Sequence, residues 1–248
     1  MSEQSAFQTK CEVCPLRQND IFRALEHKEL TFVSRFKTGE LTVEAGATIV
    51  LEQNMSPHLY TLLDGWAFRH KSLPDSRRQI LNFLLPGDLV GLQLAVLDEM
   101  DHTVTALTDT TLCVFQRDRI WSVFQDYPSL AFSLTWLAAR EEQMLDGQVM
   151  SLGQRTAPER LAYLILNLHD RAESIGYARN ASFDTPFDQT HLADALGISP
   201  VHLRRTMSHL EDRDLFEWNG KRITILDRKK LEAEACYTKD GIGQRPLI

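Results

Sequence analysis

One stretch, from Gln189 to Ile225, constrains the fold of this chain more than any other. A short helix with an apolar face is expected up to Leu196, and Gly197 stands where helices commonly end in a left-handed residue. Ser199 followed by Pro200 is typical of the start of a second helix. Two helices joined by a short turn that contains glycine form a helix-turn-helix.

The segment after these two helices predicts a wing. Apolar residues flank Asn219-Gly220, which is a strong signal for a two-residue hairpin turn. A helix-turn-helix followed by a hairpin is a winged helix, which typically reads duplex DNA. The chain carries a net charge of −7, which counts against a general nucleic-acid coat, but residues 189–230 contain eight Lys or Arg against six Asp or Glu. Local charge matters more than the total, so a specific DNA reader is still expected.

The expected second helix has two different faces. Leu203, Met207 and Leu210 recur at helical spacing and should face the core. The residues predicted to contact DNA are Ser199, Val201, His202, Arg204, Arg205 and Ser208. Among these, the two arginines best suit guanine edges or phosphates. The alternative is a solvated basic helix in a winged helix that binds protein.

The first half of the chain has a different pattern. A helix is expected over residues 19–35. Short apolar segments separated by glycines then follow from Thr38 to Val114, which is typical of an all-β barrel or roll. The predicted strands are Thr48–Leu51, Leu59–Leu63, Trp66–Lys71, Gln79–Phe83 and Leu112–Phe115.

Pro128 begins a predicted long helix with a seam of residues at alternating spacings of four and three. We interpret this helix as a dimerisation element that uses Leu130, Leu134, Leu137, Glu141, Met144 and Leu145. Two copies of Glu141 would then repel each other across the axis. The alternative is a helix packed on its own β domain. After this helix, Thr156 and Glu159 form a capping box that opens another helix.

Cys11 and Cys14, followed by Pro15, form a knuckle that can hold a metal centre. The alternative is two incidental thiols. The sequence shows no signal-peptide pattern and no apolar run long enough to cross a bilayer. We therefore expect a cytoplasmic protein without membrane contact, whose four cysteines are reduced thiols or ligands.

The order of these elements resembles the Crp/Fnr family of bacterial transcription regulators. Gly87-Asp-Leu-Val-Gly91 and Ala157-Pro-Glu-Arg-Leu161 are the most telling local matches besides the winged helix. The resemblance implies an α+β fold with an N-terminal β-roll of the cyclic-nucleotide-binding type, a long dimerisation helix and a C-terminal winged helix-turn-helix. It also implies a homodimer on a two-fold-symmetric operator in double-stranded DNA, with RNA polymerase as a candidate partner.

The predicted domains follow from this order. They are an N-terminal sensor segment at 1–24, a β-roll at 25–127, a dimerisation helix at 128–152, a winged helix-turn-helix at 153–238 and a tail at 239–248.

The signal sensed by the β-roll is a separate question. The family's cyclic-AMP branch carries Gly-Glu-Leu and then Arg-Ser or Arg-Thr to hold the cyclic phosphate. In this chain Asp88 replaces the Glu, and no Lys or Arg lies between Arg78 and Arg117. A buried phosphate without a cation or a nest of backbone donors would be poorly paired, so no cyclic nucleotide is expected.

Gly-Asp-Leu-Val-Gly is similar to the Fnr branch, whose oxygen sensors hold a [4Fe-4S] cluster through Cys-x2-Cys-x5-Cys and a later Cys. Cys11, Cys14 and Cys113 match three of those positions, and Asp20 stands where the remaining Cys is expected. The resemblance implies a cluster with these four ligands, the carboxylate being a harder ligand than a thiolate. Alternatively, Asp20 caps a helix. Cys236 lies outside this set and is interpreted as an incidental thiol.

The helix expected to read DNA also departs from the family. Arg205 matches the family's Arg, but Val201 stands where a Glu is usual. Glu accepts a hydrogen bond from cytosine, whereas Val can only touch a thymine methyl, so the family's usual half-site is not expected.

The leading hypothesis is therefore a DNA-binding regulator gated by a redox or oxygen signal. One alternative is a regulator that senses another signal, such as a small molecule or a gas bound to haem through His58, His70 or His102. Another is an iron–sulfur electron carrier. The sequence contains no nucleophile elbow, no glycine-rich phosphate loop and no His-Glu-x-x-His pair, so no enzyme is expected.

Overall fold

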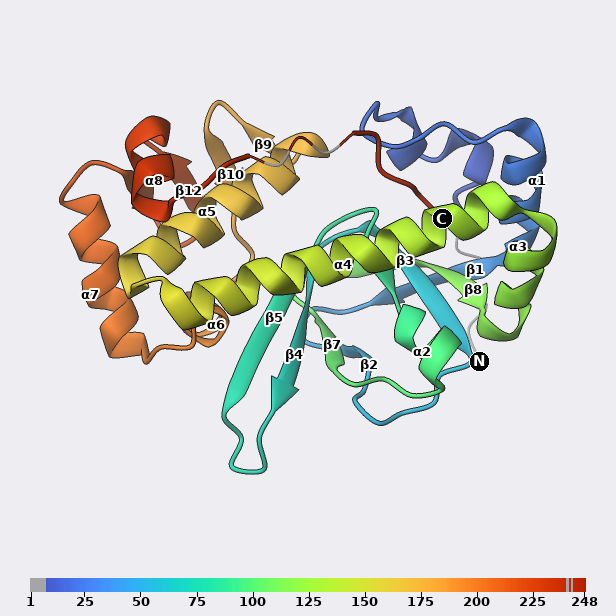
Figure 1. Cartoon of the computed structure of the whole chain (residues 1–248), viewed down its shortest axis with the longest axis horizontal. Coiled ribbons are helices and arrows are strands. Elements are labelled where there is room, and N and C mark those ends of the chain that lie inside the picture. The colour runs from blue at the N-terminus through green and yellow to red at the C-terminus, as the bar shows by residue number, and fades with distance from the viewer. Residues whose placement is uncertain (1–7, 240, 242) are drawn as a thin grey trace.

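The structure is a computed structural model that describes residues 8–239, 241 and 243–248. Two lobes lie along the long helix α4 (Pro128–Gln154), as Figure 1 shows. The first lobe contains a β-roll with short helices beside it, and the second lobe is mainly helical. This mixed arrangement agrees with the α+β class expected from the sequence.

The β-roll consists of two four-stranded antiparallel sheets, with the orders β1-β8-β3-β6 and β2-β7-β4-β5. Each strand predicted from the sequence overlaps one of these strands. The strands are β1 (Lys37–Val43), β2 (Thr48–Val50), β3 (His58–Asp64), β4 (Ala67–Ser72), β5 (Arg78–Leu84), β6 (Leu89–Val90), β7 (Thr103–Ala106) and β8 (Thr110–Gln116). The helices of this lobe are α1 (His27–Phe36), α2 (Leu92–Leu97) and α3 (Ile120–Asp126).

The first sheet is covered on both faces, and the two-residue period of a strand explains how. In β3, Tyr60 and Leu62 belong to the same apolar cluster as Val104 of the second sheet. Leu59 and Leu63, which alternate with them, pack with residues of the helices outside the roll. One strand therefore contributes to the interior of the roll and to its contact with α4.

The predicted dimer seam of α4 faces its own chain. Leu130, Leu134 and Leu137 are 1%, 2% and 7% exposed and belong to the cluster that includes the outer face of the first sheet. Glu141 Oε2 lies 3.0 Å from Arg69 Nη1 of β4, so this carboxylate is engaged by its own β-roll. The assignment of these four residues to a dimer seam is therefore corrected. The apolar stripe of a helix shows that this face is buried, but it does not show whether the same chain or a second copy covers it.

The other two residues assigned to the seam differ from these four. Met144 is half-buried and lines the cavity between the lobes. Leu145 is exposed at 36%. On the opposite side of α4, Phe132 and Val149 are each 70% exposed.

The second lobe has the local features that the sequence predicted. Helix α5 (Ala157–Ser174) opens with the capping box, in which Glu159 accepts a hydrogen bond from the backbone nitrogen of Thr156 at 2.8 Å. Gly197 (φ 64°) ends α6 (Gln189–Leu196), and α7 (Pro200–Glu211) follows. Helix α8 (Arg228–Ala235) comes after a sheet of β9 (Ala178–Arg179), β10 (Ser182–Asp184), β11 (Phe216–Trp218) and β12 (Arg222–Ile225) in the order β11-β12-β10-β9.

The helix predicted over residues 19–35 begins only at His27. Two short 3-10 turns, Cys11–Val13 and Leu16–Gln18, precede a stretch that is not helical. There the side chain of Asn19 accepts a hydrogen bond from the backbone nitrogen of Ile21 at 3.0 Å. Such local side-chain bonds compete with helix formation, and the capping box that Glu26 forms with Glu29 sets the actual start.

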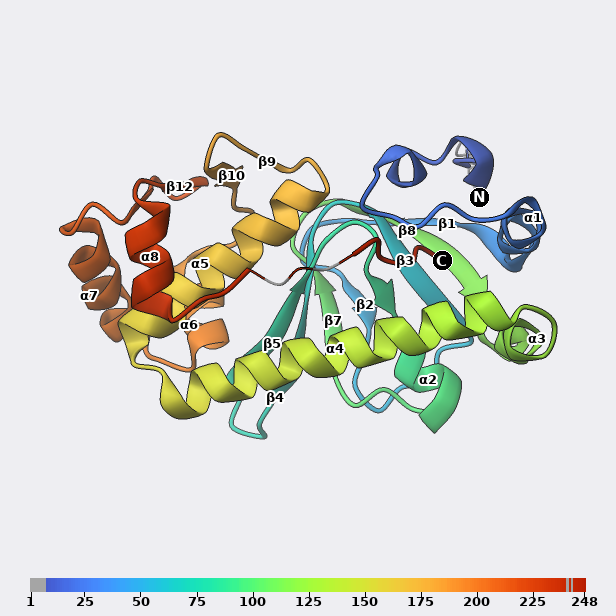
Figure 2. The ribbon, with the colours of Figure 1, turned by 45° about the horizontal axis from the view of Figure 1, so that its top comes forward.

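The tail segment, residues 243–248, lies against the first lobe (Figures 1 and 2). Arg245 pairs with Phe22 in a parallel β-bridge. Among the described residues, no helix combines the length and apolar character needed to span a membrane.

We expect the free energy of unfolding to fall between about pH 6.5 and pH 4 because of His102. Burial, with the nearby charge of Arg69, lowers the pKa of His102 from 6.5 to about 4. In that window the unfolded chain binds more protons than the folded chain, so stability is lost as the pH falls through it. The full shift corresponds to about 3 kcal/mol.

Denaturant unfolding of wild type and His102→Gln across this range measures that contribution. The variant should have a flatter pH dependence than wild type, and His27→Gln, at an exposed histidine, should not. A pH dependence that is the same in all three proteins would remove His102 as its source.

Candidate nucleic-acid interface and metal centre

The second helix of the helix-turn-helix presents one polar face to solvent. Ser199 caps α7, since its hydroxyl accepts a hydrogen bond from the backbone nitrogen of His202 at 3.2 Å. Leu203, Met207 and Leu210 are buried, as their spacing predicted. The residues predicted to contact DNA are all exposed, and they are Ser199, Val201, His202, Arg204, Arg205 and Ser208.

The wing adds two exposed cations that the sequence analysis did not single out. Lys221 and Arg222 follow the turn at Asn219-Gly220, where Gly220 has a φ of 86°. Arg222 Nε lies 2.7 Å from Asp184 Oδ1 of β10, and both side chains are exposed. The signal was present in the sequence, because two basic residues directly after a hairpin turn place positive charge at the tip of the wing.

The first helix of the motif is held against the β-roll. Arg78 of β5 forms an ion pair with Asp194 of α6, with an Nη2–Oδ2 distance of 2.6 Å. The backbone oxygen of Ala195 accepts hydrogen bonds from Gln79 at 3.1 Å and from Gln148 of α4 at 2.7 Å. The orientation of the helix-turn-helix is thus defined by contacts with the first lobe.

The structure brings three of the four predicted metal ligands to one cavity. Cys11, Cys14 and Cys113 are 9%, 8% and 9% exposed and line a cavity of about 20 Å3, which we call the thiol pocket. Cys113 lies on β8 directly opposite Thr61 of β3. Leu247 and Ile248 of the tail segment line the same cavity.

Asp20 is exposed and does not line the thiol pocket. Its backbone oxygen accepts a hydrogen bond from Gln244 at 3.1 Å. It is not a helix cap either, because α1 begins at His27. The helix cap assigned to Asp20 from the sequence is therefore wrong, and the structure does not bring Asp20 to the three thiols, because spacing along the chain did not account for the turn that Asn19 makes.

Two cations surround the thiols. Lys37 Nζ donates to Glu40 at 2.6 Å and to the backbone oxygen of Thr9 at 2.7 Å. Burial lowers the pKa of Arg17, and the neighbouring cysteines oppose that effect. Arg17 Nη1 is buried and has no hydrogen-bond partner within the described residues. A positive group with an unused donor beside three thiols favours thiolates or another anionic group in the pocket.

The thiol of Cys113 keeps its proton at neutral pH until something displaces it. Burial raises the pKa of Cys113 to about 11, although Lys37 opposes this. A metal ion or cluster would therefore release protons when it binds. A cavity of about 20 Å3 has room for roughly one water molecule. The donor set fits a metal centre, but a cluster requires residues that line the pocket to move, and Leu247 and Ile248 are among those residues.

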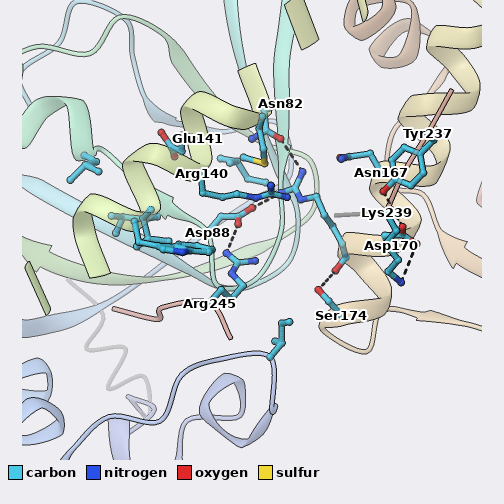
Figure 3. A pocket seen from close by; sticks show the side chains of 18 residues that line it. Asn82, Asp88, Arg140, Glu141, Asn167, Asp170, Ser174, Tyr237, Lys239 and Arg245 are labelled. Atoms are coloured by element: carbon cyan, nitrogen blue, oxygen red, sulfur yellow. Dashed lines mark hydrogen bonds and ion pairs between the residues drawn. The ribbon is translucent and has the colours of Figure 1, made fainter. Parts of the chain in front are cut away.

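A larger cavity, of about 150 Å3, lies between the lobes (Figure 3). At its edge Asp88 forms two ion pairs of 2.7 Å, one with Arg171 of α5 and one with Arg245 of the tail segment. Burial opposes ionisation of Asp88, but the two guanidinium groups hold its pKa below the ordinary value. His58, His70 and His102, considered for haem, line neither this cavity nor the thiol pocket.

A second group of possible metal ligands, on α5, is engaged in contacts within the second lobe. His169, Asp170 and Glu173 of α5 lie close enough together to hold a metal ion. Asp170 is already engaged by Arg228 at 2.8 Å and by the Tyr237 hydroxyl at 2.9 Å. This group is better explained as the contact that holds α8 and the following residues on α5.

Each of the two lobes matches a known domain family. Residues 40–127 match the cyclic nucleotide-binding domain, and residues 159–234 match the Crp-like helix-turn-helix domain. The nitrogen fixation regulation protein FixK of Bradyrhizobium diazoefficiens is 27% identical over 226 residues, which cover 91% of this chain and 94% of FixK. The transcriptional activator protein FnrL of Cereibacter sphaeroides is 26% identical over 236 residues, which cover 94% of each chain.

The solved structure of FixK2 from Bradyrhizobium japonicum is similar in fold, with a TM-score of 0.73 at 24% identity, over 81% of this chain and 98% of that one. The β-roll, the long helix and the helix-turn-helix thus occur together in the relatives as they do here. The chain belongs to the Crp/Fnr family of DNA-binding transcription regulators.

Proposed function

We propose that this regulator binds a two-fold-symmetric DNA site as a homodimer, and that an iron–sulfur cluster in the thiol pocket controls the binding. One observation carries the proposal: the fold brings Cys11 and Cys14 from the N-terminal segment to the same cavity as Cys113 of β8. The names of relatives such as FnrL support transcriptional activation as the outcome.

The cluster would be held by the thiolates of Cys11, Cys14 and Cys113. When bound, it supplies a centre that responds to oxygen or to redox state. The chain's own residues prepare the pocket, since the unused donor of Arg17 and the ammonium group of Lys37 favour negative charge there. Asp20 has no part in this proposal.

The alternative signal is a small molecule in the cavity between the lobes. That cavity is lined by residues of the β-roll, α4, α5 and the tail segment, so a ligand there would touch both lobes. We do not propose a cyclic nucleotide, because the carboxylate of Asp88 is already engaged by two arginines. A measurement of the iron content of the purified protein distinguishes control by a cluster from control by a small molecule.

The exposed face of α7 is proposed to enter the major groove. Recognition helices place their N-terminal residues on base edges, and Arg204 and Arg205 lie in the first half of α7. Lys221 and Arg222 of the wing would then reach the phosphate backbone beside the groove, where positive charge adds affinity without sequence preference.

Arg205→Ala should weaken binding to the specific site by about 5- to 150-fold, which corresponds to about 1–3 kcal/mol for one bidentate base contact. Fluorescence anisotropy with a labelled operator at fixed salt measures the change. Arg35→Ala is the control, because it removes the same charge from an exposed position on α1 in the other lobe. Equal losses in the two variants would assign the effect to net charge and remove Arg205 from the reading face.

A dimer requires a different face of α4 from the one that the sequence predicted. Phe132, Thr135, Ala139, Glu142 and Val149 recur at spacings compatible with one helical stripe, and all are exposed. This stripe lies opposite the leucines that pack on the β-roll. We propose it as the dimer seam, since it leaves the contacts within each chain intact.

Val149→Glu should shift the equilibrium toward the monomer, because it replaces an apolar contact of the seam by a carboxylate on each copy, in addition to the carboxylates of Glu142. Sedimentation velocity over a range of protein concentrations measures the change. Leu73→Glu is the matched control, since Leu73 is 53% exposed and lies in the turn between β4 and β5. A dimer that persists in Val149→Glu would contradict this choice of face.

Anaerobically purified wild type should contain iron and acid-labile sulfide, and Cys113→Ser should contain much less of both. Serine keeps the size of the side chain but removes a soft ligand. Cys236→Ser, at an exposed thiol outside the pocket, should match wild type, and so should Asp20→Ser. Absence of iron from wild type, or equal iron in Cys113→Ser, would rule out the cluster.

A further inference from the structure

The chain that follows α8 contacts both lobes. After α8, the hydroxyl of Tyr237 donates a hydrogen bond to Asp170 of α5 at 2.9 Å, and Lys239 Nζ lies 2.9 Å from a carboxylate oxygen of Glu173. Residues 243–248 lie against the first lobe, as Figures 1 and 2 both show. Tyr237 and Lys239 are therefore anchored on the second lobe, and the tail segment is anchored on the first lobe.

At the sensor lobe, the backbone of Arg245 is clamped by the N-terminal segment. Its nitrogen donates to Ile21 O at 2.7 Å, and its oxygen accepts from Arg23 N at 2.8 Å. Its guanidinium group lies over the ring of Phe22, with 5.2 Å between Cζ and the ring centroid. This N-terminal segment continues directly from the Cys11–Cys14 knuckle.

The side chain of Arg245 shares one carboxylate with the second lobe. Arg245 Nη2 lies 2.7 Å from Asp88 Oδ1, and Arg171 Nη2 of α5 lies 2.7 Å from Asp88 Oδ2. Figure 3 shows Asp88 and Arg245 meeting at the edge of the cavity between the lobes. The ion pair that positions α5 on the roll therefore depends on the same carboxylate as the ion pair that positions the tail segment.

The end of the tail segment closes the thiol pocket. Leu247 and Ile248 are 3% and 6% exposed and line the pocket together with the three cysteines. Thr61 donates a hydrogen bond to Ile248 O at 2.5 Å, and Arg17 Nη2 donates to Leu247 O at 3.4 Å. Thr61 is the strand partner of Cys113, so these contacts lie directly beside a predicted ligand.

We propose that residues 243–248 form a latch that closes the thiol pocket and holds the DNA-binding lobe against the β-roll in a state of low DNA affinity. The pocket has space for about one water molecule while Leu247 and Ile248 line it, so a cluster and the docked latch exclude each other. Release of the latch removes Arg245 from Asp88, so that the tail segment no longer restrains the second lobe and Arg171 remains as the partner of Asp88. The link to a cluster rests on the function proposed above, whereas the latch itself rests on these contacts.

Because a cluster and the docked latch exclude each other, a change in the thiol pocket can alter DNA binding. Because coupling between two sites is reciprocal, whatever fills the pocket favours release of the latch, and whatever releases the latch opens the pocket. The lobe that carries α7 then loses its restraint, so that two copies in a dimer can adjust to two half-sites.

The test uses the full chain, reduced and free of metal, so that it does not depend on the cluster. A small neutral maleimide is added in short pulses, and peptide mass spectrometry gives the labelling rate of each cysteine. In wild type Cys236, which is exposed, should react quickly, and Cys11, Cys14 and Cys113 should react slowly. Arg245→Ala should speed labelling of these three by about fivefold or more and leave Cys236 unchanged.

The same variant should bind the specific operator about fivefold or more tightly than wild type. Arg35→Ala, at an exposed position on α1, should change neither quantity. Leu247→Ala, which leaves every charge in place, should also speed labelling of the three thiols. This variant replaces Arg245→Ala in the test if Arg245→Ala is too unstable to purify. Circular dichroism of each variant separates local opening from global unfolding.

Unchanged labelling of Cys11, Cys14 and Cys113 in Arg245→Ala and Leu247→Ala would overturn the latch, even if wild type contains iron. Faster labelling with unchanged or weaker DNA binding would overturn its inhibitory role. Faster labelling and tighter DNA binding in a protein that never contains iron would support the latch and reject the cluster, so that the two proposals fail separately.

Discussion

The relation between the two lobes depends on one buried carboxylate. Asp88 lies at the edge of the β-roll, where its two oxygens meet Arg171 of α5 and Arg245 of the tail segment at 2.7 Å each. The backbone nitrogen of Leu85 donates to the same carboxylate at 2.8 Å. A charge at this depth is stable only with partners. Loss of Asp88 itself would leave both guanidinium groups without their shared anion, and breaking a buried ion pair in this way typically costs about 3–5 kcal/mol. The position of Asp88 therefore constrains both segments that reach it.

Apolar contacts hold the lobes together but do not by themselves set their orientation. Trp66, Phe68 and Phe83 of the roll belong to the same buried cluster as residues of α5, α6 and α7. Hydrophobic burial is not directional, whereas ion pairs and hydrogen bonds have defined geometry. The pairs at Asp88 and between Arg78 and Asp194 supply that geometry. A signal that disturbs them can move the DNA-binding lobe while its own core stays intact.

The parts of the fold that depend on neighbouring residues could be predicted from the sequence. Ser199 caps α7, Gly197 ends α6, and Thr156 with Glu159 opens α5, because each feature is determined by side chains within a few positions. The apolar periodicity of α4 also predicted a helix. It could not show that the β-roll covers its leucines, since burial by the same chain and burial by a second copy select the same residues.

The parts of the candidate sites that depend on distant residues could not be read from spacing. The turn at Asn19 moved Asp20 out of the thiol pocket, although the position matched the expected ligand. The tail segment has no periodicity, and its main contacts join residues far apart in sequence, such as Arg245 with Asp88. Convergence of Cys113 with Cys11 and Cys14 was expected only through the family resemblance, because no local pattern links β8 to the N-terminus.

Control of DNA binding by the thiol pocket is tested most directly by the operator affinity of one anaerobic preparation before and after exposure to oxygen. We expect wild type and Cys236→Ser to change affinity by about fivefold or more, and Cys113→Ser to show the same affinity in both conditions. An affinity of wild type that does not change on exposure, or a change of equal size in Cys113→Ser, would contradict control through the thiol pocket.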